Sequence, residues 1–151
     1  FEMARRGIVE DLLSNVEDIV FPEHRLLTFQ KASWKYDSEA GANCTSDKLA
    51  AAGFTYTGTR SEPTSAQCVF CLKEYIFEAS DDPKEEHVRS KKCEFVKMGQ
   101  PSDALTLTME QLTILLASRR AVQMVMWGDH QIEAYEKAAK EVMSSHKLPG
   151  I

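Results

Sequence analysis

Three of the four cysteines lie with one histidine at the spacing of a zinc site, and this feature constrains the fold most strongly. Cys68 and Cys71 form a C-x2-C pair, and His87 and Cys93 follow 16 and 22 positions after Cys71. A two-residue gap lets one tight turn aim two thiolates at one ion, while a helix and the next loop supply the other ligands. Four such ligands fill a tetrahedral structural site and leave no position that activates water. The sequence predicts one structural zinc ion.

Other interpretations of these residues have weaker signals. Cysteines also cluster as small buried hydrophobic residues, but a histidine at ligand spacing favours a metal. A cysteine enzyme using Cys71 or Cys93 with His87 as base needs an orienting group and an oxyanion hole, and the sequence shows no signature for either. A zinc deaminase places His-x-Glu ahead of its cysteine pair, whereas here the pair comes first. We expect a non-enzymatic protein, with a zinc hydrolase or cysteine enzyme as the alternative.

Length and composition fit one small domain with an extension. The 151 residues are 43% hydrophobic, enough for one core but not for two ordinary domains. A net charge of -5 argues against a surface that binds nucleic-acid phosphates directly. No apolar run approaches the roughly 20 residues that span a bilayer, and the first residues lack the apolar block of a signal peptide. We expect a soluble intracellular protein without membrane or direct nucleic-acid contact.

Short helices and strands surround the predicted ligands. Residues 8–20 form an amphipathic helical pattern that ends at Pro22. Thr45 or Ser46 is placed to cap the predicted helix at 47–52, and Gly53 ends that helix. The other predicted segments are helices at 24–31, 47–52 and 84–90, a loop at 36–43, and strands at 54–57, 67–70 and 74–78, the last two forming a hairpin around the cysteine pair.

A long helix follows the metal-binding region. Residues 107–146 form a continuous helical pattern, which is on the order of 60 Å at about 1.5 Å per residue. So small a domain cannot cover this length, which favours partner helices over folding back onto the domain. Gly128 weakens the helix and marks a candidate bend. The predicted partner-binding residues recur at heptad-like spacings, with Trp127 as an anchor: Val125, Trp127, Ile132, Tyr135, Ala139 and Val142.

Several motifs resemble, in order and spacing, the baculoviral inhibitor-of-apoptosis repeat (BIR). They are His24-Arg25-Leu26-Leu27-Thr28-Phe29, Cys44-Thr45 through Gly53-Phe54, Gln67-Cys68-Val69-Phe70-Cys71, Asp81-Asp82-Pro83 with Glu86-His87, and Cys93-Glu94-Phe95. The resemblance implies an α+β zinc fold, with a three-stranded antiparallel sheet and short helices. One repeat with no RING after it, followed by Leu105-Thr106-Leu107 and a long helix, is similar to survivin and its invertebrate relatives. The expected parts are an N-terminal segment 1–20, a BIR domain 21–98, a linker 99–106, a long helix 107–146 and a tail 147–151.

This resemblance implies an adaptor in chromosome segregation and cytokinesis. Survivin-like proteins join the chromosomal passenger complex, where the long helix bundles with helices of borealin and the inner centromere protein and so localises Aurora B kinase. The implied locations are the nucleus, the centromere, the spindle midzone and the cytoplasm. The groove beside the sheet binds free N termini, notably the histone tail phosphorylated on its third residue, a threonine. The resemblance implies that the groove residues in this chain are Lys73, Glu74, Tyr75, Phe77, Asp81, Glu86 and Ser90. The alternative is an apoptosis inhibitor that binds caspases or their antagonists.

The sequence departs from the family pattern in this groove. Ile76 stands for an acidic residue that holds the peptide's amino group, Phe77 for a tryptophan, and Ser90 for a phosphate-contacting histidine. Phe77 has the alternative role of filling the core, and Asp82 is expected to cap the following helix. Arg25 is expected to be structural. The groups that can still hold a peptide's charges are Asp81 for an ammonium and Lys73, Arg89, Lys91 and Lys92 for a phosphate.

A homodimer is a further expectation. In survivin-like proteins the segment ahead of the repeat and the Leu-Thr-Leu linker form a dimer contact. The matching residues here are Leu12, Leu13, Val16, Leu105 and Leu107. Docking of the N-terminal segment onto the chain's own long helix is the alternative.

Overall fold

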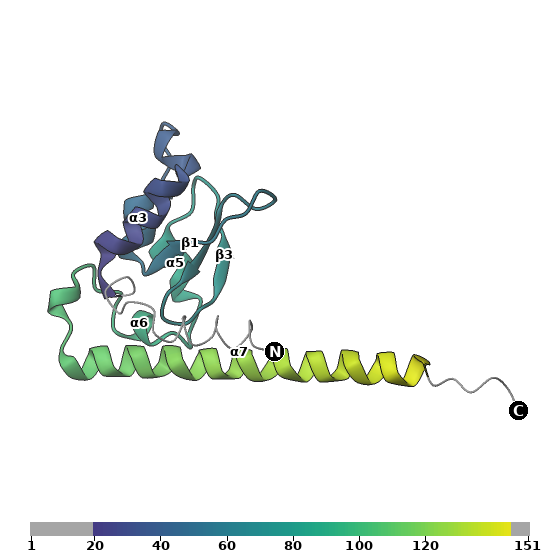
Figure 1. The fold of residues 1–151 in the computed structure, drawn as a ribbon. Helices are drawn as coiled ribbons and strands as arrows, with labels where there is room; N and C mark the ends of the chain where they lie inside the picture. Colours follow the sequence, from purple (N-terminus) through teal and green to yellow (C-terminus); the bar gives the residue numbers. More distant parts are fainter. Residues whose placement is uncertain (1–19, 146–151) are drawn as a thin grey trace, which may run out of the picture.

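A small mixed domain and a long C-terminal helix make up residues 20–145, the part of the chain that this computed structural model describes (Figure 1). The elements are α3 (Pro22–Ala32), η1 (Lys35–Ser38), α4 (Ser46–Ala51), β1 (Phe54–Tyr56), β2 (Ser65–Cys68), β3 (Glu74–Ile76), α5 (Pro83–Val88), α6 (Glu94–Lys97), η2 (Ala104–Thr106) and α7 (Met109–Ser145). The candidate dimer residues Leu12, Leu13 and Val16 lie outside the described residues, as does the tail 147–151.

The three strands form one antiparallel sheet in the order β1-β2-β3. Phe54 of β1 pairs with Cys68 of β2, and Ala66 of β2 pairs with Tyr75 of β3. The turn between β2 and β3 holds the C-x2-C pair and ends at Leu72, whose φ is 58°. The predicted α+β fold is confirmed, with its three-stranded antiparallel sheet and a hairpin built around the cysteines.

Aromatic side chains fill the space between the sheet and the helices. Phe54 is fully buried, and its ring meets those of Tyr75 and Phe77 edge-on at centroid distances of 5.4 and 5.2 Å. The His87 ring lies 4.8 Å from that of Phe54. Phe77 is only 1% exposed, and its carbonyl oxygen accepts a hydrogen bond from Tyr36 Oη at 3.1 Å. Phe77 therefore has the core role, and little of its side chain is available to an open groove.

Arg25 is a charged side chain buried in this core. It is 1% exposed, and it donates from Nε to the Ala50 carbonyl oxygen at 2.8 Å and from Nη1 to that of Val20 at 3.0 Å. Its guanidinium carbon lies 5.9 Å from the centroid of the Phe70 ring. Burial lowers the pKa of Arg25 to about 10, which keeps the group charged at neutral pH. The structural role expected for Arg25 is confirmed.

The two predicted helix caps have different outcomes. Asp82 Oδ1 accepts hydrogen bonds from two backbone N–H groups of the first turn of α5, at 2.9 and 3.2 Å, as predicted. For α4 the predicted position is right, since Thr45 is the N-cap residue, but the side chain of Thr45 makes no capping hydrogen bond. Asp37 Oδ1 accepts from the Ser46 N–H instead, at 2.8 Å. Asp37 lies in η1, so part of the segment predicted as a loop at 36–43 is a 3₁₀ turn that serves the next helix.

Helix α7 runs for 37 residues, or about 55 Å at about 1.5 Å per residue. It begins two positions after the predicted start at residue 107 and passes through Gly128 without a break, so the candidate bend is not seen (Figure 1). Its first half lies along the domain, and its second half extends past it (Figure 1). Within residues 20–145, no helix combines the length and apolar character that crossing a bilayer requires.

Candidate metal centre

Three elements bring the four predicted ligands to one point. Cys68 ends β2, and Cys71 follows it in the turn that we call the zinc knuckle, residues 68–71. His87 lies in α5, and Cys93 occupies the N-cap of α6. Their ligand atoms all lie within 4.8 Å of one another, with Cys71 half-buried and the other three side chains buried. The fold therefore closes four residues that are separated in the sequence into a single donor set.

The distances within this set fit a tetrahedral zinc ion. Cys68 Sγ lies 4.0 Å from Cys93 Sγ, and Cys71 Sγ lies 3.8 Å from His87 Nε2. Zinc–sulfur bonds of about 2.3 Å at a tetrahedral angle separate two sulfur atoms by about 3.8 Å. All four cysteines are free rather than joined in disulfides. Cys68, Cys71, His87 and Cys93 form the zinc-binding site, and as a closed Cys3His set they leave no coordination position for a reacting water.

Hydrogen bonds orient the ligands. His87 Nδ1 lies 2.9 Å from the carbonyl oxygen of Ala52, and because a carbonyl only accepts, Nδ1 carries the hydrogen. The other ring nitrogen, Nε2, then faces the ligand cluster with its lone pair available to a metal. The backbone N–H groups of Phe70 and Cys71 donate to Cys68 Sγ at 3.4 and 3.5 Å. These bonds stabilise negative charge on that sulfur.

Protonation in the cluster is tightly coupled. Burial raises the pKa of the Cys68 thiol, whereas hydrogen bonds from Cys68 and Cys93 hold the pKa of Cys71 well below its usual range. Burial lowers the pKa of His87, but its hydrogen bonds to Cys71 and Cys93 outweigh that effect and raise the pKa to about 9. Protons therefore occupy some donors of the cluster near neutral pH, and an incoming metal ion must displace them.

Arg25 complements the charge of the loaded site. Three thiolates and one Zn²⁺ leave a net charge of about -1 in a buried position. Burial lowers the pKa of Arg25, and the charge of Cys68 acts against that lowering. The guanidinium thus supplies the nearby positive charge that a buried anionic centre requires.

The predicted groove residues on β3 divide between its two faces. Tyr75 packs on the core side, and Lys73 Nζ lies 4.9 Å from the centroid of its ring. Glu74 faces the other side, because side chains alternate along a strand. Its carboxylate accepts hydrogen bonds from the hydroxyls of Ser65 at 2.6 Å and Thr57 at 2.8 Å, and these bonds lower the pKa of Glu74. Glu74 therefore lies on the face opposite the core-side groups of β3.

The groove residues near α5 are partly engaged within the domain. Asp81 Oδ2 accepts a hydrogen bond from a backbone N–H three residues earlier, at 2.7 Å. Glu86 forms an ion pair with Arg89 at 2.9 Å. The buried Oη of Tyr75 has no hydrogen-bond partner in the described part of the chain, although Ser90 is near enough to oppose the increase in the Tyr75 pKa that burial causes. The structure therefore brings together Lys73, Tyr75 and Ser90 and keeps Glu74 apart from them, while the buried Phe77 stacks on the Tyr75 ring at a centroid distance of 5.9 Å.

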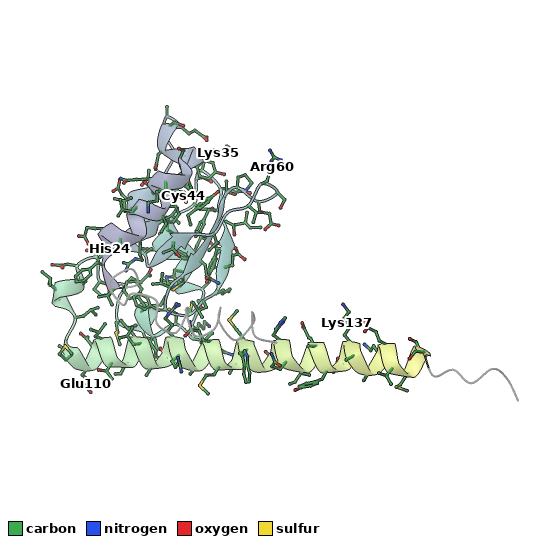
Figure 2. The ribbon with its side chains drawn as sticks, viewed as in Figure 1. His24, Lys35, Cys44, Arg60, Glu110 and Lys137 are labelled. Carbon is green, nitrogen blue, oxygen red and sulfur yellow. The ribbon has the colours of Figure 1, made fainter. Side chains whose placement is uncertain are left out.

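The residues predicted to bind partner helices are all exposed. Of the six, Val125, Trp127, Ile132, Tyr135 and Val142 expose between 48 and 66% of their surface, and Ala139 is also exposed. Figure 2 labels Glu110 at the start of α7 and Lys137 on the part that extends past the domain. In the candidate dimer linker, Leu105 is 84% exposed, whereas Leu107 is half-buried against the core.

Some contributions to the site carry no sequence signal. The Ala52 carbonyl that orients His87 belongs to a backbone group, which any residue type provides. Arg119 of α7 donates from Nη1 to the carbonyl oxygen of Val69 in the zinc knuckle, at 2.9 Å across 50 positions of sequence. No motif links these residues, because their contact depends on how α7 packs against the domain.

The buried Cys3His centre, the three-stranded sheet around it and the appended helix define a class of protein, a small zinc-stabilised domain with a helical extension. Residues 25–97 match the family model of the inhibitor of apoptosis domain, BIR. The chain belongs to the BIR family, and within it to the survivin-like proteins.

Three curated relatives show the extent of the similarity. The chain is 39% identical over 129 residues to baculoviral IAP repeat-containing protein bir-2 of Caenorhabditis elegans. This alignment covers 83% of this chain and 41% of the relative. It is 38% identical over 120 residues to chromosomal passenger complex protein bir-1 of the same organism, covering 79% and 72%. It is 40% identical over 88 residues to baculoviral IAP repeat-containing protein 5 of Cavia porcellus, covering 57% and 59%. The chain thus spans less than half of bir-2 and about three fifths of the Cavia protein.

Proposed function

We propose that this protein is a non-enzymatic adaptor of the chromosomal passenger complex, which binds partner helices through α7 and protein N-terminal tails through its zinc domain. One relative of similar sequence is named as a chromosomal passenger complex protein. The observation that carries the proposal is the exposed apolar surface of α7. Through this adaptor role the protein contributes to chromosome segregation and cytokinesis, at the centromere and spindle midzone as well as in the nucleus and cytoplasm.

The apolar surface of α7 lies away from the domain. At about 3.6 residues per turn, Ile132, Tyr135 and Ala139 point to roughly the opposite side of the helix from Leu115 and Arg119, which face the domain. A helix side with apolar residues at heptad-like spacing is the surface that bundles use. The proposed occupants are borealin-like and inner-centromere-protein-like helices, which connect the adaptor indirectly to Aurora B kinase. The helix and the zinc domain then serve different partners at the same time.

The charges beside β3 support tail binding by the zinc domain. Asp81 and Glu86 supply carboxylates for a free amino group, and Lys73 supplies a cation beside the Tyr75 ring. Arg89, Lys91 and Lys92 add exposed positive charge after α5. The proposed ligand is the histone tail phosphorylated on its third residue, a threonine, because it combines an N-terminal ammonium with a nearby phosphate.

Calorimetry with the zinc-loaded protein tests the tail proposal. Phosphorylated, unmodified and N-acetylated histone-tail peptides are titrated in parallel. We expect the phosphorylated peptide to bind more tightly than the unmodified one and the acetylated peptide to lose most of its affinity. If none of the three binds, tail recognition is refuted and the helical adaptor role stands alone.

Co-purification with helical partners tests α7. Ile132→Asp combined with Val142→Asp places charge on the apolar side and is expected to abolish co-purification while the zinc domain stays folded. His130→Asp combined with Ser144→Asp is the matched control, because both positions are exposed on the other side of the helix. Equal co-purification of the two double variants would refute the assignment of this surface.

The family match also keeps a second function in view, since its model is that of an inhibitor of apoptosis domain. In that role the zinc domain would bind caspases or their antagonists. The discriminating measurement is caspase activity in the presence of purified protein. Inhibition at a stoichiometric ratio favours this second function, and unchanged caspase activity at excess protein excludes direct inhibition.

A further inference from the structure

Helix α7 contacts the domain at the turn that holds two of the zinc ligands. Val69 and Phe70, the two residues between Cys68 and Cys71, are 6 and 2% exposed. Arg119 Nη1 donates to the Val69 carbonyl oxygen at 2.9 Å. Leu115, one turn earlier in α7, is fully buried and belongs to the same core cluster as Phe70. The appended helix therefore covers the zinc knuckle.

We propose that Arg119 is a positioning residue for the zinc knuckle, so that docking of α7 and retention of zinc stabilise each other. The Val69 residue is held from two directions by groups outside the knuckle. Its N–H donates to the Gly53 carbonyl oxygen at 2.9 Å, and its carbonyl oxygen accepts from Arg119. These two bonds fix the peptide groups on either side of Val69 and, through them, the direction in which the cysteine side chains leave the turn.

The coupling works in both directions. When the ion leaves, Cys68 and Cys71 are no longer tied to His87 and Cys93, and the knuckle relaxes. The Val69 carbonyl then moves away from the line of the Arg119 donor, and a hydrogen bond weakens steeply with such misalignment. By linkage, an interaction that favours the docked position of α7 strengthens zinc binding by the same free energy with which bound zinc favours docking.

A directional bond adds to the apolar packing of α7 on the domain. Leu115 is the one fully buried residue of α7, and Leu112, Leu116 and Val122 are half-buried. A hydrogen bond from a guanidinium to a backbone carbonyl is charge-assisted and stronger than a neutral one. It therefore adds a directional constraint to the packing that sets how α7 lies against the domain (Figure 1).

Zinc-release rates test the proposal. The zinc-loaded full chain is mixed with the chromogenic chelator 4-(2-pyridylazo)resorcinol, and the rate of metal transfer is followed by absorbance. Arg119→Met removes the donors at similar length, and we expect release about tenfold faster, the effect of losing one charge-assisted hydrogen bond. Arg120→Met is the matched control at the next, exposed position, and its rate should stay within about twofold of wild type. Arg119→Lys, which keeps the charge and one donor group, should fall between them.

A second comparison separates coupling from general loss of stability. Asp82→Ala weakens α5 through its cap and does not touch α7. We expect Arg119→Met, but not Asp82→Ala, to increase amide hydrogen exchange at residues 112–118 and to shift the visible absorption bands of the cobalt-substituted site. If both Arg119 variants release zinc at the Arg120→Met rate, or if Asp82→Ala reproduces every effect of Arg119→Met, the proposal is overturned.

Discussion

The Nε of Arg25 in α3 donates to the carbonyl oxygen of Ala50, in the last turn of α4, at 2.8 Å. Two residues further on, the Ala52 carbonyl oxygen accepts from the zinc ligand His87 at 2.9 Å. The last carbonyls of a helix have no partners within it, so they must bond elsewhere. At this helix end, a buried cation and a metal ligand bond to the carbonyls of Ala50 and Ala52, which joins α3, α4 and α5 around the zinc site.

Replacing Arg25 with methionine should destabilise the domain strongly. The substitution leaves the Ala50 and Val20 carbonyl oxygens without this donor and removes the positive charge near the thiolates. We expect the free energy of unfolding to fall by about 3 kcal/mol in chemical denaturation. Lys31→Met, the same type of change at an exposed position of α3, should cost less than about 0.5 kcal/mol. Equal effects of the two substitutions would contradict a structural role for Arg25.

The zinc site should be required for folding, and Cys44 should not belong to it. Cys71→Ala is expected to abolish zinc binding and the cooperative unfolding transition, because zinc adds on the order of 10 kcal/mol to small domains of this kind. Elemental analysis and circular dichroism of the purified chain measure both effects. Cys44→Ala should retain one zinc per chain, since Cys44 stands outside the cluster in the core. Loss of zinc from Cys44→Ala would contradict the ligand assignment.

Two glycines with similar backbone conformations should respond differently to alanine. Gly53 has a φ of +92°, and a Cβ there would lie 3.0 Å from the Phe95 ring. Gly41 has a φ of +81°, but a Cβ there would meet nothing within 4 Å. Both substitutions cost about 1 kcal/mol for the left-handed backbone, and Gly53→Ala should cost a further 1 kcal/mol or more, on the order of an overpacked core position. Thermal unfolding of the two variants measures the difference, and identical melting temperatures would show that Phe95 moves aside freely.

Burial of Cys44 should make the domain sensitive to alkaline pH. Burial raises the pKa of this thiol from 9.0 to about 12. The folded state therefore keeps a proton that the unfolded state releases above about pH 9. The contribution is fully present below that pH and is lost as the pH rises towards 12. We expect the unfolding free energy of wild type to fall more steeply with pH in this range than that of Cys44→Ala.

The parts of the fold that local chemistry controls could be predicted from sequence. The C-x2-C gap specifies a turn whatever surrounds it, and the Asp82-Pro83 pair specifies a helix start, so both were found in place. The cap of α4 could not be found in this way, because its acceptor is Asp37 from a separate turn. The division of the groove residues was also missed, since residues carried over one by one from a family do not reveal that Glu74 and Tyr75 alternate across a strand.

The sequence by itself determined the identity of the zinc ligands, the existence of α7 and the family. These depend on the spacing of thiol and imidazole groups along the chain and on the period of apolar residues in one helix. Only the tertiary structure decided which carbonyl orients His87, that Phe77 is buried, and that Arg119 reaches the knuckle. Such contacts join positions far apart in the chain, and their geometry is set by how helices and sheet pack, which no local pattern of residues encodes.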